Sequence, residues 1–205
     1  MKPLTPDDPD LMAYLRASSR RFENAVRRVA KKNPELGPTV YIVASDMVSG
    51  EDWAEAIRKN KVTAEQAVWR VGSFARLDWA IKHCSPQFVI NNLPRLWVGS
   101  DPDDTKPAYL NLWRRAFKLN GNRIICDGPE LPRGELFKLC RGQSEGAPRG
   151  ISWSRSRKVA RQFADGAGVR FKLTDGVVIE EIVHRSRILA YLTSRKEFEC
   201  IVAPE

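Results

Sequence analysis

Residues 177–202 read VVIEEIVHRSRILAYLTSRKEFECIV, and this stretch decides the fold of the C-terminal part of the chain. Its apolar runs are short, they are rich in β-branched residues, and polar residues separate them. Such runs predict β-strands rather than helices. We expect strands over 177–183, 188–192 and 198–202. Because Thr-Asp-Gly at 174–176 signals a tight turn, residues 169–173 are expected to pair with the first of these strands in a hairpin.

The residues before this stretch extend the β-rich pattern back to about residue 121. ELFKLC at 135–140 and GISW at 150–153 indicate two further strands, and RIIC at 123–126 is a short apolar run. Residues 155–165 differ, because their apolar residues recur at helical spacing. We therefore expect residues 121–205 to be mainly β with one inserted helix.

Residues 1–120 have a mostly helical pattern instead. Apolar residues recur at helical spacing from Leu11 to Val29, after aspartates that favour a helix N-terminus. Thr63 and Gln66 fit a capping box, which predicts a long helix from there to about Cys84. The β-branched run TVYIVA at 39–44 is interpreted as a strand or an extended connector. The other expected helices cover 51–59, a start at Ser85-Pro86, and 107–119.

These patterns predict an α+β protein with a helical region over 1–120 and a β-rich region over 121–205. They leave open whether the two regions fold separately or form one compact unit. Apolar residues make up 42% and charged residues 29% of the chain, as in ordinary globular proteins.

The charge of the chain and its targeting signals indicate which partners and which cell compartment to expect. The net charge of +9 is spread along the chain and favours anionic partners, among them dinucleotides and nucleic acids. No apolar run approaches the roughly 18 residues of a membrane-spanning helix, and the first residues contain no secretory signal. We therefore expect a cytoplasmic protein with no membrane partner. The scattered Cys84, Cys126, Cys140 and Cys200 are interpreted as thiols rather than as metal ligands.

Two short segments carry candidate binding chemistry. Arg141 and Gly142 are expected at a strand end, where the arginine suits phosphate binding and the glycine allows a ligand close to the backbone. The alternative is an ordinary surface turn. Ser152 and Ser154 flank Trp153, which should face the core. Their hydroxyls are suited to holding a neighbouring carboxylate, or alternatively to capping the helix that follows.

A third segment, EFECIV at 197–202, presents a carboxylate from an apolar strand. Glu199 shares a strand face with Ile201, while Phe198 and Cys200 share the other. The alternative is that this acid is a charged residue on an edge strand, where charges oppose aggregation.

The three segments, in this order, resemble the motifs of the Arg-Ser-Glu class of mono-ADP-ribosyltransferases, which includes bacterial toxins and phage-encoded enzymes. The matching residues are Arg141, Ser152-Trp153-Ser154 and Glu197-Phe198-Glu199. The resemblance covers roughly residues 131–205. It departs at Cys140, where the family carries an aromatic residue, and at Trp153, where many members carry threonine. It implies that the C-terminal region forms a split β-sandwich.

The resemblance also implies a reaction: transfer of ADP-ribose from NAD to a protein, with release of nicotinamide and no need for a metal. Glu199 would stabilise the positive charge that develops on the ribose, Ser152 would orient Glu199, and Arg141 would hold NAD. Glu197 would orient or deprotonate an arginine acceptor on a protein of a host or rival cell. The remaining residues expected at the cofactor are Gly142, Ser154 and Phe163, the last being equally a candidate core residue.

Two other functions remain open from the sequence. An NAD glycohydrolase would use the same residues with water as the acceptor. A non-enzymatic basic protein could bind nucleic acid through arginine-rich helices such as that containing Arg20-Arg21. Neither a G-x-G-x-x-G segment nor a P-loop occurs, so these two nucleotide-binding motifs are not indicated.

Overall fold

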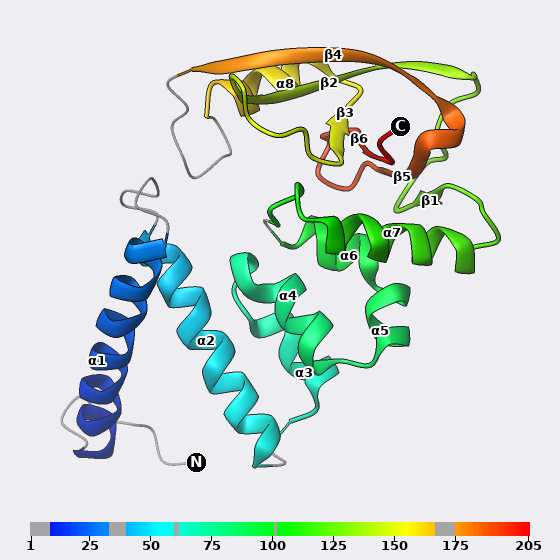
Figure 1. The fold of residues 1–205 in the computed structure, drawn as a ribbon. Coiled ribbons are helices and arrows are strands. Elements are labelled where there is room, and N and C mark those ends of the chain that lie inside the picture. The colour runs from blue at the N-terminus through cyan, green and yellow to red at the C-terminus, as the bar shows by residue number, and fades with distance from the viewer. Residues whose placement is uncertain (1–8, 33–39, 60–61, 101, 167–174) are drawn as a thin grey trace. The chain divides into compact units, whose positions relative to one another are not determined.

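The computed structural model describes residues 9–32, 40–59, 62–100, 102–166 and 175–205. The chain divides into two compact units, Met1–Cys84 and Ser85–Glu205. The described part of the first unit is helical, and the second contains both helices and a sheet, so the protein is α+β as predicted (Figure 1). The boundary between the two compact units follows Cys84, whereas the last helix before the first strand ends at Leu119.

In the first unit, helices α1 (Pro9–Lys32) and α2 (Val40–Arg58) pack against each other. Ala44, Met47 and Val48 of α2 recur at helical spacing and meet α1 in one apolar cluster. The predicted strand or connector over 39–44 is therefore wrong for residues 40–44, and Thr39 lies outside the described residues. Packing against α1 overrides the local β-preference of this run. The helix predicted over 51–59 is the second half of α2.

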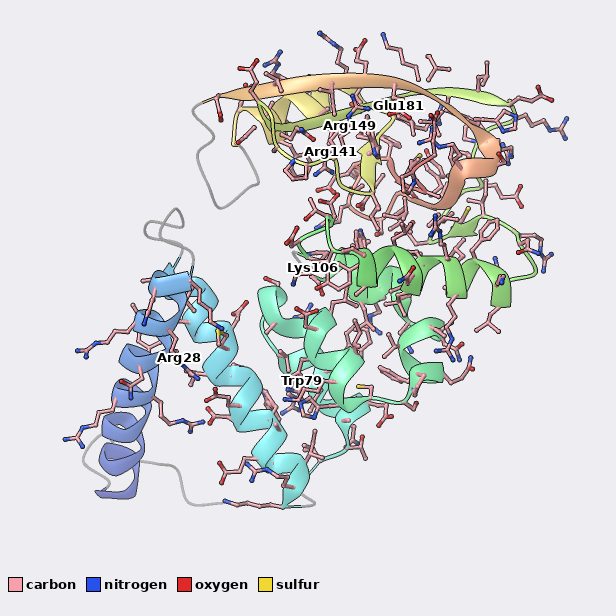
Figure 2. All side chains as sticks on the ribbon, viewed as in Figure 1. Arg28, Trp79, Lys106, Arg141, Arg149 and Glu181 are labelled. Atoms are coloured by element: carbon pink, nitrogen blue, oxygen red, sulfur yellow. The ribbon has the colours of Figure 1, made fainter. Side chains whose placement is uncertain are left out.

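The predicted capping box at Thr63 and Gln66 is present, but the long helix after it is interrupted. The chain forms α3 (Ala64–Ala67), a 3₁₀ turn η2 (Val68–Arg70) and then α4 (Ser73–His83). Gly72 is extended between them, and any Cβ there would collide with the Asp46 side chain of α2. Trp79 of α4 donates a hydrogen bond to the Gly50 carbonyl oxygen at 2.9 Å, which joins α4 to α2 (Figure 2).

The second unit begins with α5 (Pro86–Asn91), α6 (Leu93–Val98) and α7 (Pro107–Leu119). The predicted cap at Ser85 is confirmed, because its hydroxyl accepts the Phe88 N–H at 3.3 Å. The predicted helix over 107–119 matches α7. Helix α7 packs against strand β5 of the sheet, and α8 (Arg157–Ala164) packs against β2 and β4 (Figure 1).

Among the described residues, the sheet contains six strands in the order β1-β5-β6-β3-β2-β4. Its only parallel pair among the described strands is β1 with β5, and the other neighbours are antiparallel. The strand bounds are β1 Ile125–Cys126, β2 Leu136–Ser144, β3 Ser152–Ser154, β4 Gly176–His184, β5 Ile188–Leu192 and β6 Glu199–Val202.

Most predicted strands are found, with one difference that matters for the site. Strand β2 continues to Ser144 because it pairs with β4 up to the Ser144–Gly176 register, so Arg141 lies inside a strand and not at its end. The strand predicted over 169–173, and with it the hairpin, lies outside the described residues. The strand predicted over 150–153 begins two residues later, at Ser152.

The two faces of the sheet have different neighbours. Trp153 and Cys200 point into an apolar cluster that also contains Leu139, Val183 and Val202, as predicted for Trp153. Ser152 and Glu199 alternate with these residues and lie on the other face. Gly142 and Gly176 let α8 approach the sheet, since a Cβ on either would collide with the backbone of α8. None of the described helices is long and apolar enough to cross a membrane.

Candidate active site

Glu199 is a buried carboxylate at the first position of β6. Only 6% of the residue is exposed. Phe198, just before it, has a positive φ of 51°, and its carbonyl oxygen accepts the Arg155 N–H at 3.0 Å. The chain turns at this point, and Glu199 enters the sheet opposite Ser154 of β3 and Leu192 of β5. The local fold therefore sends a charged side chain into the protein, where a carboxylate is rarely buried without partners.

Two donors hold one oxygen of this carboxylate. The Ser152 hydroxyl donates to Glu199 Oε1 at 2.5 Å, and the Trp97 indole N–H donates to the same atom at 2.8 Å. The other oxygen, Oε2, lies 3.9 Å from Arg195 Nη2. Burial raises the pKa of Glu199 above the ordinary glutamate value, and the hydrogen bonds from Ser152 and Trp97 oppose part of that shift.

Trp97 was missed by the sequence analysis, although it is a direct partner of Glu199. It lies in α6 and is 2% exposed. Its ring makes edge-on contacts with Tyr109 and Trp113 of α7, with centroids 5.9 Å and 5.7 Å away. Because both neighbours belong to one helix, α7 fixes the orientation of the indole and hence the position of its N–H.

Arg141 lies inside β2 and joins three segments of the chain. Its Nη1 donates to Asp104 Oδ2 at 2.6 Å and to the Ser152 carbonyl oxygen at 2.7 Å, and its Nη2 donates to Asp104 Oδ1 at 3.0 Å. Nε donates to Gln143 Oε1 at 3.0 Å. A fork-to-fork pair of this kind is strong and directional. Arg141 is therefore a clamp between β2, β3 and the loop before α7.

Asp104 is the second site residue that the sequence analysis missed. Besides binding Arg141, it accepts the Ser152 N–H at 2.9 Å, and its own carbonyl oxygen accepts the Ile151 N–H at 3.2 Å. The side chain fits only because residue 150 is glycine, since a Cβ there would collide with the carboxylate. Residues 99–106 (GSDPDDTK) are polar, but nothing local in the sequence indicates which of their acids contacts the sheet.

Ser154 and Glu197 shape the turn that leads into β6. The Ser154 hydroxyl donates its proton to the Glu197 carbonyl oxygen at 2.6 Å and accepts the Ser156 N–H at 2.9 Å. Ser156 in turn caps α8 through the Val159 N–H. The hydroxyl predicted to contact a cofactor is thus engaged with the backbone. The Glu197 carboxylate is ion-paired with Arg195, with Oε2 and Nη2 2.9 Å apart.

All of the predicted site residues line one pocket. Its volume is about 290 Å³, just below the range of about 300–1,000 Å³ for small-molecule sites. The predicted residues that line it are Arg141, Gly142, Ser152, Ser154, Phe163, Glu197 and Glu199. The lining residues that carried no prediction of a role include Trp97, Ser100, Asp104 and Arg195.

Ser100 is a lining residue of this pocket whose hydroxyl is buried. It is 4% exposed, and its hydroxyl has no hydrogen-bond partner among the described residues. Buried hydroxyls normally have a partner, so the buried Oγ of Ser100 is an exception beside this pocket.

Comparison with protein-family models, curated proteins and solved structures found no match to this chain.

Proposed function

We propose that the protein is an NAD-dependent mono-ADP-ribosyltransferase that transfers ADP-ribose to a protein acceptor, with arginine as the acceptor residue. The observation that carries the proposal is the buried carboxylate of Glu199, which Ser152 and Trp97 hold in a pocket that Arg141 also lines. The resemblance of these residues to the Arg-Ser-Glu class supports it. The split β-sandwich and an acceptor protein of a host or rival cell belong to the same proposal.

The proposed chemistry begins with cleavage of the bond between nicotinamide and ribose. Its transition state resembles an oxocarbenium ion, so positive charge develops on the ribose. A fixed carboxylate in a poorly hydrated site stabilises this charge more than it stabilises the ground state. Because Ser152 and Trp97 both donate to Oε1 of Glu199, we assign Oε2 to the ribose.

Other lining residues would position the dinucleotide. Arg141 brings a guanidinium to the pocket, but Asp104 and the Ser152 carbonyl already bind it. We infer that Arg141 acts mainly by holding β2 and β3 in place and by adding positive charge beside the substrate phosphates. The half-buried Phe163 offers an apolar surface to a ring.

The acceptor assignment rests on Glu197. Its carboxylate already holds a guanidinium nitrogen, that of Arg195, at 2.9 Å. An incoming arginine must lose a proton that its guanidinium normally keeps at neutral pH and well above it, so it needs a carboxylate beside it.

Nicotinamide release and protein labelling test the proposal directly. The full chain would be incubated with adenine-labelled NAD and a cell lysate. We expect free nicotinamide together with label bound covalently to protein. Nicotinamide release with all of the label in free ADP-ribose would instead identify a glycohydrolase. A protein that releases no nicotinamide, and that binds nucleic acid with an affinity falling steeply as salt rises, would contradict the proposal.

The pH dependence of NAD cleavage should follow the ionisation of Glu199. Since its pKa is raised and the carboxylate is the active form, activity should fall with decreasing pH at a point above the ordinary glutamate range. Ser152→Ala removes a hydrogen bond that lowers this pKa. The acid limb of kcat/KM against pH should therefore move to higher pH in this variant.

Ser186→Ala provides the control for this shift in the pH profile, because the Ser186 hydroxyl is hydrogen-bonded to His184 outside the pocket. Its acid limb should coincide with that of the wild type. An acid limb that stays in place in Ser152→Ala would show that Ser152 does not set the pKa of Glu199.

Glu197→Ala should separate transfer from hydrolysis. If Glu197 prepares the guanidinium, transfer to a small guanidine compound should fall by about 10²-fold, while nicotinamide release into water should fall much less. Both rates would be measured in one reaction mixture, with Glu205→Ala, an exposed carboxylate outside this pocket, as the control. Equal losses of the two activities would argue against an acceptor role for Glu197.

A further inference from the structure

Arg195 brings a guanidinium to both carboxylates of the candidate active site. Its Nη2 lies 2.9 Å from Glu197 Oε2 and 3.9 Å from Glu199 Oε2. The residue lines the pocket, and 39% of its side chain is exposed. An arginine of this chain therefore stands where the proposed reaction requires the acceptor nitrogen to be.

The backbone of Arg195 belongs to a hydrogen-bonded turn between β5 and β6. The Lys196 N–H donates to the Thr193 carbonyl oxygen at 2.8 Å, and Lys196 has a φ of 59°. Asp127 accepts the N–H groups of Thr193 at 2.6 Å and Ser194 at 3.3 Å. Because Asp127 directly follows β1, the turn is fastened to the sheet and keeps Arg195 at the pocket.

Two other ion-paired arginines in the same unit lack this setting. Arg149 pairs with Glu181 of β4 at 3.3 Å, its side chain is 66% exposed, and neither residue lines this pocket (Figure 2). Arg141 does line the pocket, but its guanidinium is tied to Asp104, Gln143 and the backbone. Arg195 differs from both because its described partners are the proposed catalytic acids.

We propose that the enzyme ADP-ribosylates its own Arg195, an inference that rests on the transferase activity proposed above. The bond between C1 of the ribose and the nicotinamide nitrogen breaks, and nicotinamide leaves with the bonding electron pair as a neutral molecule. A guanidinium nitrogen of Arg195 forms the new bond to that carbon. Its proton passes to the Glu197 carboxylate, and Glu199 stabilises the charged ribose between the two steps. NAD is the only co-reactant.

Incubation of the purified full chain with NAD alone tests the inference, with intact mass and peptide fragmentation as the readouts. We expect one ADP-ribose per chain, located at Arg195, and a rate that does not depend on protein concentration. Arg195→Lys keeps a cation beside Glu197 and should carry no adduct at this position. Arg149→Lys changes an exposed arginine–glutamate pair in the same way and should be modified as fully as the wild type.

The route of the reaction is tested by mixing. Glu199→Gln retains Arg195 but should not modify itself. It should also stay unmodified when the wild-type protein is added, because the proposed transfer occurs within one chain. Cooperative thermal unfolding of each variant would show that its result does not come from a lost fold.

The inference and the function on which it rests fail in different ways. Nicotinamide release and labelling of external proteins without an adduct at Arg195, or with an adduct only at other residues, would overturn self-modification and leave the transferase standing. Labelling of Glu199→Gln by the wild type would overturn the intramolecular route. Absence of nicotinamide release under all conditions would overturn both proposals.

Discussion

Glu199→Gln should lower the rate of NAD cleavage by about 10²- to 10³-fold, which is the usual effect of losing one key charge-stabilising group. The amide keeps the shape of the side chain, and its oxygen can still accept hydrogen bonds from Ser152 and Trp97. The negative charge that would stabilise the ribose cation is lost. Nicotinamide release by the purified variant, measured under single-turnover conditions, checks the expected result.

The same variant should unfold at a higher temperature than the wild type at neutral pH. The folded state raises the pKa of Glu199, so between the ordinary and the raised pKa the folded protein binds more protons than the unfolded chain. The free energy of unfolding of the wild type therefore falls as pH rises through that window. The glutamine side chain does not ionise, so the variant keeps the stability that the wild type loses.

Glu180→Gln is the matched control for the effect on NAD cleavage. Glu180 lies on β4 outside the pocket, and its pKa is lowered by a hydrogen bond from Lys138. The same chemical change should leave NAD cleavage at the wild-type rate. Near-normal cleavage by a folded Glu199→Gln protein would remove Glu199 from the chemistry.

Gly142→Ala should strongly destabilise the protein, because the added methyl group would collide with the backbone of a neighbouring helix. Its Cβ would collide with the Ala160 carbonyl oxygen of α8 and lie only 2.5 Å from the Ala164 nitrogen. Both atoms belong to the backbone of a helix, so neither can move without shifting α8. We expect the free energy of unfolding to fall by about 3 kcal/mol or more, at the upper end of overpacking effects.

Urea unfolding checks this result, as a lower midpoint with an unchanged slope. Gly176→Ala should behave similarly, since its Cβ would collide with the Ala164 carbonyl oxygen. Lys138→Ala on the same strand as Gly142 removes only an exposed ion pair and should leave the midpoint near that of the wild type. A wild-type midpoint for Gly142→Ala would show that α8 does not pack against β2 as described.

Local chemistry explains which elements could be predicted from the sequence. The strand over 188–192 matches β5, and the caps at Thr63 and Ser85 are both present. Each of these features depends on residues that are neighbours in the chain. The helical state of 40–44 depends instead on packing against α1, and a β-branched run contains no sign of that contact.

The residues of the candidate site also differ in whether local sequence or distant contacts determine their place. The order Arg141, Ser152 and Glu199 could be read from short motifs on strands, and the structure places all of these residues at one pocket. Trp97 and Asp104 could not be found in this way. They meet Glu199 and Arg141 across 102 and 37 positions of sequence, and only the docking of α6 and the following loop against the sheet creates those contacts.

Strand β4 has a consequence for the behaviour of the protein in concentrated solution. Among the described strands it lies at one end of the sheet, and it exposes Ile182 to the extent of 58%. Such an edge can recruit another chain and start aggregation. Here Glu180 and Glu181 occupy its middle and are paired with Lys138 and Arg187. A second chain adding to this edge would have to dehydrate those charges, so the ion pairs oppose polymerisation of the sheet.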